Sequence, residues 1–258
     1  MELGGAKIKP TDEKNMKIIS FEGPFGCGKT TQIYRVYEEL KRRRLKVFVK
    51  PGGGGLVRRL NEEAVLYDQY FRLMGRHLSL KKKITRLLRV DPKRFYFTVD
   101  LPLTESFLVI ARYALDWEKI VLPLERRTHT TILLADRDID TFYAHQLVKF
   151  SEAKSFRDKK QILEQIRRVV LTWFRDPDLT FYIRVSAKEA RRRLNAKGTG
   201  VSHPQDIAIL RKSVENYDFL AKCFKNRFVV IDGHREENEI TKEIIKELMV
   251  YLNKEGVS

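Results

Sequence analysis

The chain has 258 residues, which is enough to bury one sizeable core, and we expect a single α/β domain over 1–258 rather than two domains. Its 51 basic residues exceed its 34 acidic residues, and the net charge of +17 favours polyanionic partners such as nucleotides or RNA without indicating a fold. With only two cysteines, no secretory leader and no apolar run near the ~20 residues of a membrane helix, we expect a cytoplasmic protein without disulfides or membrane spans.

Apolar runs alternate with helical patterns along the chain. Residues 1–14 are polar and contain glycine and proline, which predicts a loose tail. The strand-like runs are Lys17–Glu22, Leu45–Lys50, Thr130–Ala135, Leu179–Val185 and Arg227–Ile231. The helical patterns are 29–43, 104–122, 140–150, 159–174, 187–195, 205–224 and 239–252. This alternation predicts a five-stranded parallel sheet with helices on both faces and ligands at the carboxyl ends of the strands.

A glycine-rich turn follows the first predicted strand. Residues Gly23–Thr30 fit G-x-x-x-x-G-K-[ST], and a predicted helix begins directly after the glycines. Such a P-loop points backbone N–H groups at phosphate oxygens, and the helix N-terminus adds positive potential. We therefore expect the ATP-binding residues to be Gly23, Gly26, Cys27, Gly28, Lys29, Thr30 and Thr31. Lys29 would reach the β- and γ-phosphates and Thr30 would hold Mg²⁺; the alternative is a glycine-rich turn with no ligand.

The third predicted strand ends in Asp136-Arg137. A carboxylate at the end of a strand beside a P-loop strand can bind Mg²⁺ or position water near the phosphates. The guanidinium of Arg137 can offer a fork of donors to a phosphate. We expect both to be catalytic, with Asp136 sharing the metal with Thr30; the alternative is a surface ion pair.

Residues 56–101 form a basic insertion in the alternating pattern. Between Leu56 and Phe97 there are eleven Lys or Arg and four Asp or Glu, a local excess of +7. Leucines and an isoleucine recur at helical spacing between 80 and 88, with basic residues around them. A surface helix with solvated charges explains this pattern, and weak nucleic-acid binding is the alternative. Both interpretations can hold together.

Several motifs together resemble the thymidylate kinase family. They are Phe21-Glu22-Gly23, Gly26-x-Gly28-Lys29-Thr30-Thr31-Gln32, Pro51-Gly52-Gly53, Asp136-Arg137, Asp140-Thr141-x-x-Ala144-x-Gln146, Pro177-Asp178-Leu179-Thr180 and Val229-Val230-Ile231-Asp232-Gly233. The resemblance covers most of the chain outside the insertion, and its nucleotide-binding half is more specific than its substrate half. We identify the chain as a divergent member of this family.

The resemblance implies that ATP lies on the P-loop and a nucleoside monophosphate faces it. Arg137 would hold the acceptor phosphate, and Arg112 would face the base or the phosphate. Thr141 and Gln146 would line the base pocket. An ionised phosphate acceptor needs no general base, so positioning, Mg²⁺ and cationic stabilisation would carry the transfer. Members of the family are commonly dimeric, which implies a homodimer.

The departures from the family pattern fall on the acceptor side. Phe25 stands where the family usually has an acid that reads the sugar 3′-hydroxyl region, and an apolar ring cannot accept that hydrogen bond. Lys50 replaces a usual Glu, and Leu108 replaces an aromatic residue that stacks on the base. We still expect Phe25 to line the substrate site. The acceptor therefore need not be thymidylate.

Residues 191–204 are predicted to form a lid, in which basic residues precede the flexible segment Gly198-Thr199-Gly200. The P-loop has Gly26 at a position where an arginine could stabilise the transition state, so we expect this cation to come from the lid. Arg193 is our candidate. The alternative is that these basic residues only form a solvated helix end. Two other functions stay open. One is a kinase of nucleic-acid or nucleoside hydroxyls, which would need a base such as Glu22 or Asp136. The other is a non-catalytic ATP-binding protein.

Overall fold

A five-stranded sheet forms the centre of the fold. The computed structural model describes residues 16–52, 60, 110–111, 113–126, 131–152, 159–172, 174–196 and 207–257. The strands are β1 (Met16–Glu22), β2 (Val47–Lys50), β3 (Thr131–Asp136), β4 (Leu179–Arg184) and β5 (Phe228–Asp232). They lie in the order β2-β3-β1-β4-β5, and every neighbouring pair is parallel. The predicted five-stranded parallel sheet is confirmed.

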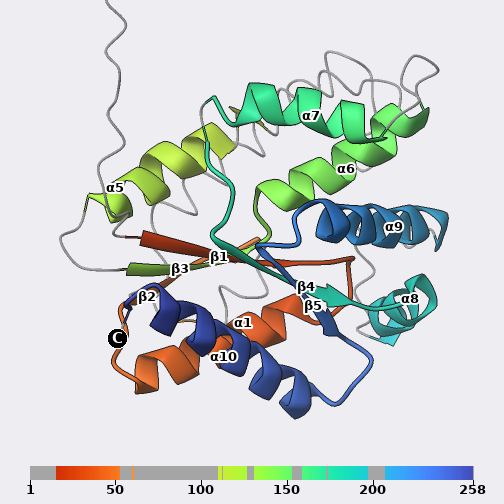
Figure 1. Ribbon diagram of the computed structural model, residues 1–258. Coiled ribbons are helices and arrows are strands. Elements are labelled where there is room, and N and C mark those ends of the chain that lie inside the picture. The colour runs from red at the N-terminus through yellow and green to blue at the C-terminus, as the bar shows by residue number, and fades with distance from the viewer. Residues whose placement is uncertain are drawn as a thin grey trace, which may run out of the picture.

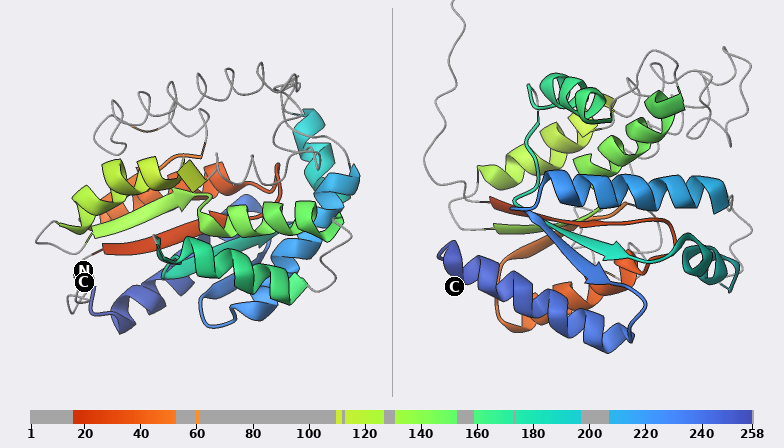
Figure 2. Two further views of the ribbon diagram at one scale, coloured as in Figure 1. Left: turned by 90° about the horizontal axis from the view of Figure 1, so that it is seen from above. Right: turned by 45° about the vertical axis from the view of Figure 1, so that its right-hand side comes forward.

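Helices cover both faces of this sheet (Figure 1). The helices of one face are α1 (Lys29–Arg42) and α10 (Glu237–Lys254). Those of the other face are α5 (Leu122–Glu125), α6 (Ile139–Glu152) and α9 (Ile207–Cys223), with α7 (Lys159–Val170) packed against α6. The helix α8 (Ala187–Ala196) follows β4 at the carboxyl end of the sheet (Figure 2).

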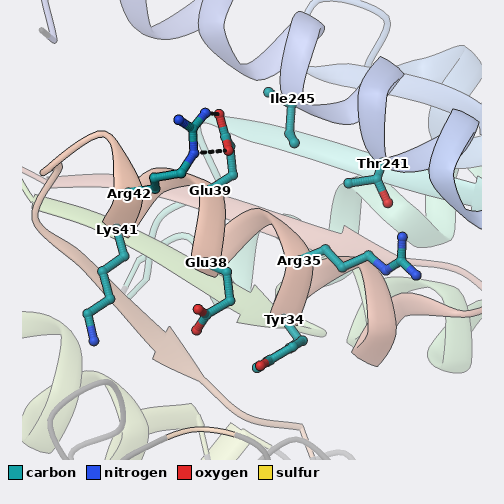
Figure 3. A pocket seen from close by; sticks show the side chains of 8 residues that line it. All are labelled: Tyr34, Arg35, Glu38, Glu39, Lys41, Arg42, Thr241 and Ile245. Carbon is teal, nitrogen blue, oxygen red and sulfur yellow. Dashed lines mark hydrogen bonds and ion pairs between the residues drawn. The ribbon is translucent and has the colours of Figure 1, made fainter.

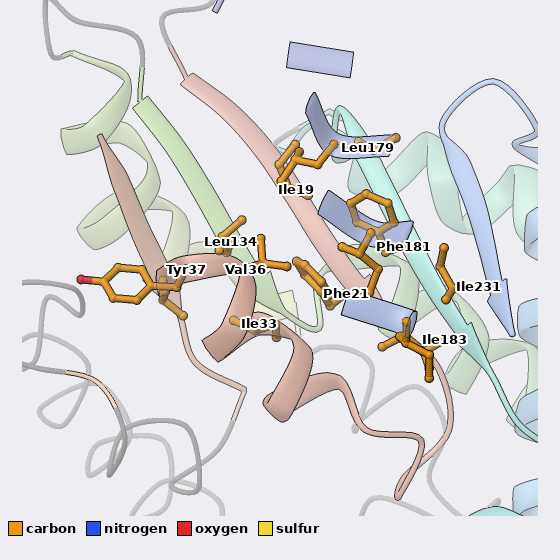
Figure 4. Packing of buried hydrophobic residues seen from close by; sticks show 14 of the residues in the cluster. Ile19, Phe21, Ile33, Val36, Tyr37, Leu134, Leu179, Phe181, Ile183 and Ile231 are labelled. Carbon is orange, nitrogen blue, oxygen red and sulfur yellow. The ribbon is translucent and has the colours of Figure 1, made fainter. Parts of the chain in front are cut away.

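Alternation along β1 divides its apolar residues between the two faces of the sheet. Ile19 and Phe21 of β1 pack with α1 and α10, whereas Met16 and Ile18 pack on the opposite face with Ile120 and its neighbours. On the α1 side, apolar residues of the strands meet the buried stripe of α1 (Figure 4). That stripe includes Gln32, Ile33, Val36, Tyr37 and Leu40, a helical period. Packing α1 against β1 in this way fixes the P-loop between them.

The helix predicted over 104–122 differs from expectation at its end. A π-helical turn, η1 (Trp117–Val121), leads into α5, and the chain stays helical through Pro123 to Glu125. Proline has no N–H to donate, and a widened turn directly before it lets the backbone continue without that bond. The sequence pattern ended the helix three residues too early, at 122 instead of Glu125.

The other predicted elements are confirmed to within a few residues at their ends. The predicted tail 1–14 lies outside the described residues, and so does the insertion 56–101 except for Leu60, which belongs to the core under α1. Residues 197–204 of the expected lid also lie outside them. Among the described helices, none is both long and apolar enough to cross a membrane.

Candidate active site

The glycine-rich turn forms the junction between β1 and α1. Gly28 is the N-cap of α1, and the N–H groups of Thr31 and Gln32 donate to its carbonyl. At Gly26 the backbone has a φ of +80°, and a Cβ there would lie 2.6 Å from the carbonyl oxygen of Ala190 in α8. Only glycine combines this left-handed backbone with so close an approach. The P-loop is therefore seated directly against α8.

The ammonium group of Lys29 is folded over the P-loop. Its Nζ donates to the carbonyl oxygens of Gly23 and Pro24, each at 2.9 Å, and lies 3.3 Å from the Sγ of Cys27. Burial, and then the nearby charge of Arg137, lower the pKa of Lys29. A phosphate bound in the loop would replace these carbonyl contacts with charge-assisted ones, which are stronger.

Thr30, at the start of α1, lies beside Asp136, the last residue of β3. The Thr30 hydroxyl donates to Oδ2 of Asp136 at 3.4 Å, so the two oxygen ligands expected for Mg²⁺ are adjacent. The described residues hold no cluster of three or more His, Cys, Asp or Glu side chains that could bind a metal. Mg²⁺ beside phosphates commonly uses one or two protein oxygens and several waters, so this pair fits that ion.

Gly52 follows β2 and passes very close to Asp136. A Cβ at Gly52 would lie 2.2 Å from the carbonyl oxygen of Asp136 and 3.2 Å from its side-chain carboxyl carbon. No side chain fits in that space. The glycine of the Pro51-Gly52 motif thus allows β2 and β3 to end side by side with Asp136 in place.

Arg137 has an unusual backbone for an arginine. Its φ is +73°, in the left-handed region, and its N–H donates to the carbonyl oxygen of Phe21 at 3.2 Å. The guanidinium carbon lies 4.2 Å from the centre of the Phe25 ring. The Phe25 ring also stacks with His145 of α6, with centroids 6.4 Å apart and planes inclined by 23°. The structure thus brings Phe25 and Arg137 together, a contact that the sequence did not indicate, and their substrate-binding roles stay predictions.

Three contacts hold Asp138, the residue after Arg137. Its carboxylate accepts from Nζ of Lys50 at 2.9 Å, and both side chains are buried. Its N–H donates to Glu22 at 2.7 Å, and its carbonyl oxygen accepts from the Tyr113 hydroxyl. Lys50 also lies 5.3 Å from the centre of the Tyr113 ring. The charge reversal at Lys50 therefore has a partner that sequence analysis did not identify.

Glu22 is fully buried beneath this loop. Besides the Asp138 N–H, its carboxylate accepts hydrogen bonds from Ser20, Thr141 and Tyr217. Burial, and then the carboxylate of Asp140, raise the pKa of Glu22 to about 7 against the hydrogen bonds that lower it. Tyr217 comes from α9, and no motif at that position pointed to the site; only Glu22 carried a signal, as part of Phe21-Glu22-Gly23.

The residues expected to line the base pocket are Thr141, Gln146 and Arg112, and the structure describes the first two. The Thr141 hydroxyl is bound to Glu22 and lies 2.9 Å from the Tyr217 hydroxyl, and Gln146 is buried with 1% of its surface exposed. Arg112 lies outside the described residues. The shared hydrogen bonds to Glu22 thus hold Thr141 beside the backbone of Asp138, and the base-binding roles of all three residues stay predictions.

A hollow of about 520 Å³ lies on the other side of the P-loop. It is lined by residues of the P-loop, α8 and the segment leading into α10, among them Cys27, Thr31, Ile183, Arg193, His234 and Ile240. Arg193 donates to Glu189 at 2.6 Å and to the carbonyl oxygen of Gly233 at 2.8 Å. The expected lid arginine therefore borders this hollow, and its catalytic role stays a prediction.

Another hollow, of about 600 Å³, lies between α1 and α10 (Figure 3). Its lining includes Tyr34, Arg35, Glu38 and Thr241 but none of the P-loop or acceptor-side residues described above. It is therefore separate from the phosphate-binding site.

Comparisons with known proteins agree with this arrangement. A family model described as thymidylate kinase matches residues 149–244. The chain is 29% identical over 238 residues to a thymidylate kinase of Caldanaerobacter subterraneus, covering 92% of this chain and 96% of that one. It is 31% identical over 152 residues to a probable thymidylate kinase of Methanosarcina mazei, covering 59% and 70%. It is also 27% identical to a thymidylate kinase of Mycoplasmopsis agalactiae, covering 89% and 93%.

Proposed function

The chain belongs to the thymidylate kinase family, and we propose that it transfers the γ-phosphoryl group of ATP to thymidylate or a closely related nucleoside monophosphate. It is accordingly a nucleotide kinase. The observation that carries the assignment of residues is the hydrogen bond between Thr30, at the start of α1, and Asp136, the last residue of β3 directly before Arg137. The phosphate-binding loop and the arginine assigned to the acceptor also lie side by side, because Arg137 contacts Phe25 of that loop.

On the ATP side, the P-loop amides and Lys29 bind the β- and γ-phosphates. Thr30 and Asp136 are the residues that would hold Mg²⁺, which when bound neutralises charge between the two phosphates. The hollow beside the P-loop, bordered by Arg193, would receive the nucleoside part of ATP. Its place next to Cys27 and Thr31 supports this role.

On the acceptor side, Arg137 would bind the monophosphate and align one of its oxygens with the γ-phosphorus of ATP. A new P–O bond forms to that oxygen as the bond between the γ-phosphorus and the bridging oxygen to the β-phosphate breaks, and ADP leaves. The attacking oxygen is already ionised, so no side chain has to remove a proton. Lys29 and Arg137 then stabilise the charge that spreads over the migrating group.

The hydroxyl-acceptor alternative is less well supported by these residues. Such a kinase needs a base within reach of the attacking hydroxyl. Glu22 has no exposed surface, and its carboxylate already accepts four hydrogen bonds. Of the two candidate bases, Glu22 and Asp136, only Asp136 is left for this role. Asp136 is also the expected metal ligand, so one group would have to do both tasks.

Two partner proposals rest on the sequence and its resemblance alone. The basic residues of 56–101 would give weak, sequence-independent nucleic-acid binding, whose logarithm should fall linearly with the logarithm of salt concentration. A homodimer follows from the family resemblance. Salt titration of RNA binding and light scattering of the purified chain test these two proposals.

The central experiment is a screen of acceptors with labelled ATP. Thymidylate, the other nucleoside monophosphates, nucleosides and total RNA are each incubated with the enzyme and Mg²⁺. We expect transfer to at least one monophosphate and none to hydroxyl acceptors. Labelling confined to RNA or nucleosides would reject the proposal, and tight ATP binding with no transfer would favour a non-catalytic protein.

A further inference from the structure

We propose that Phe25 is a positioning residue for Arg137: the face of its ring holds the guanidinium in the orientation that receives the acceptor phosphate. This inference rests on the proposed function, because it assigns Arg137 to that phosphate. It adds a residue whose side chain takes no part in the chemistry. Phe25 would act only through the arginine.

The contact joins two separate parts of the site. Phe25 is half-buried within the P-loop, and Arg137 follows β3, with 4.2 Å between the guanidinium carbon and the ring centre. That distance is well inside the range in which a cation is attracted by an aromatic ring. The P-loop that binds the donor phosphates therefore also sets the place of the acceptor-binding cation.

A ring suits this task better than a carboxylate would. Within the part of the chain that the structure describes, the Arg137 guanidinium forms no ion pair, whereas the half-buried Arg193 and Arg227 are paired with Glu189 and Asp140. A carboxylate partner would neutralise the guanidinium and occupy its N–H donors. An aromatic face attracts the cation while leaving the charge available to a phosphate.

His145 adds a second contact to the same ring without adding charge. Desolvation, and then the charges of Arg137 and Lys29, lower the pKa of His145 to about 3, so the imidazole is neutral at physiological pH. The ring of Phe25 therefore has a neutral neighbour in α6 and a cationic neighbour in Arg137. The contact with His145 thus holds the Phe25 ring against α6, independently of the arginine that the ring supports.

The test replaces Phe25 by Leu, which keeps an apolar side chain but removes the ring, and by Trp, which keeps an aromatic face. We expect Phe25→Leu to raise the KM of the monophosphate about 3- to 30-fold, the range of a cation–π contact, while the Kd of ATP changes less than about twofold. Phe25→Trp should recover most of the loss. A Leu variant that weakens ATP as much as the acceptor would overturn the proposal, because the ring would then serve only the fold of the P-loop.

A double-mutant cycle with Arg137→Ala decides whether Phe25 acts through the arginine. In the Arg137→Ala background, Phe25→Leu should change the acceptor KM by less than about twofold, because the group it positions is absent. Equal effects in both backgrounds would overturn the inference. A wild-type enzyme that transfers phosphate to no monophosphate would instead overturn the proposed function on which it rests.

A fluorinated phenylalanine at position 25 keeps the test valid if the Leu variant does not fold. Fluorination weakens the negative face of the ring while nearly keeping its shape. We expect the acceptor KM to rise stepwise with the number of fluorines, with unfolding temperature and ATP affinity unchanged. A KM that is independent of fluorination would contradict the electrostatic contact.

Discussion

The ammonium group of Lys50 lies 2.9 Å from the carboxylate of Asp138, and both side chains are buried. Asp138 directly follows Arg137, whose left-handed φ of +73° is costly for an arginine. The ion pair therefore ties the end of β2 to a strained turn that carries the acceptor-binding residue. Strain of this kind persists where surrounding contacts hold it in place.

Lys50→Met should lower the free energy of unfolding by about 3 to 5 kcal/mol, because it leaves the Asp138 carboxylate buried without its partner. Adding Asp138→Asn should recover part of that loss, since the uncompensated charge is then removed. Urea unfolding of the single and double variants measures both effects. Additive losses would show that the pair is not coupled.

Lys29→Ala should reduce phosphoryl transfer by at least ~2 to 3 orders of magnitude, the scale of losing one preorganised donor to the transition state. Lys41→Ala is the matched control, because Lys41 is an exposed lysine of the same helix. It should leave the rate within about twofold of wild type. Single-turnover assays with labelled ATP compare the three proteins, and wild-type transfer by Lys29→Ala would refute the P-loop mechanism.

Arg137→Ala should impair the acceptor far more than ATP, and Arg137→Lys should rescue it poorly because a point charge lacks the bidentate fork. Arg137→Gly separates the side chain from the backbone. Glycine adopts a positive φ at little cost, so this variant should be about 1 kcal/mol more stable than Arg137→Ala while having the same raised KM for the acceptor. Steady-state kinetics and urea unfolding give the two readouts; a raised requirement for ATP alone would reverse the assignment of Arg137.

Gly52→Ala should displace Asp136, because the new Cβ would lie 2.2 Å from the Asp136 carbonyl oxygen. We expect the Mg²⁺ concentration at half-maximal rate to rise about tenfold, in line with the cost of disturbing a group that positions a metal ligand. ATP binding measured without Mg²⁺ should change little. If both ATP binding and the Mg²⁺ requirement are unaltered, the close approach does not position Asp136.

Glu22→Gln should remove a pH dependence of stability. Because the pKa of Glu22 is raised from 4.5 to about 7 in the folded protein, the folded state binds more protons between those values, and stability falls as pH rises from about 4.5 to 7. The variant lacks this loss, so its stability relative to wild type should increase by about 1 to 3 kcal/mol from pH 5 to pH 8.

Glu39→Gln provides the control for this comparison. The pKa of Glu39 is lowered by its hydrogen bonds to Arg42 and Arg43, so its stabilising effect is lost only as pH falls below the usual value. The difference in the free energy of unfolding between Glu39→Gln and wild type should be the same at pH 5 and pH 8. Urea unfolding at both pH values tests the pair, and a constant difference for Glu22→Gln would contradict the raised pKa.

Features carried by neighbouring residues were predictable from the sequence. The P-loop lies within eight consecutive residues, so its glycines, Lys29 and Thr30 specify a local structure whatever packs around it. The five parallel strands were predictable from apolar runs separated by helical patterns, because a strand that is buried on both faces of a sheet is apolar along most of its length. Asp136-Arg137 was predictable since it directly ends such a strand.

Contacts between distant segments were decided only by the tertiary structure. Tyr217 reaches Glu22 across 195 residues, and Lys50 reaches Asp138 across 88, and neither pairing leaves a periodic or spaced pattern in the chain. The sequence showed Phe25 only as an apolar residue where an acid was expected. That its ring lies over Arg137 depends on β1 and β3 being neighbours in the sheet, because their parallel register brings the P-loop and the end of β3 to the same edge.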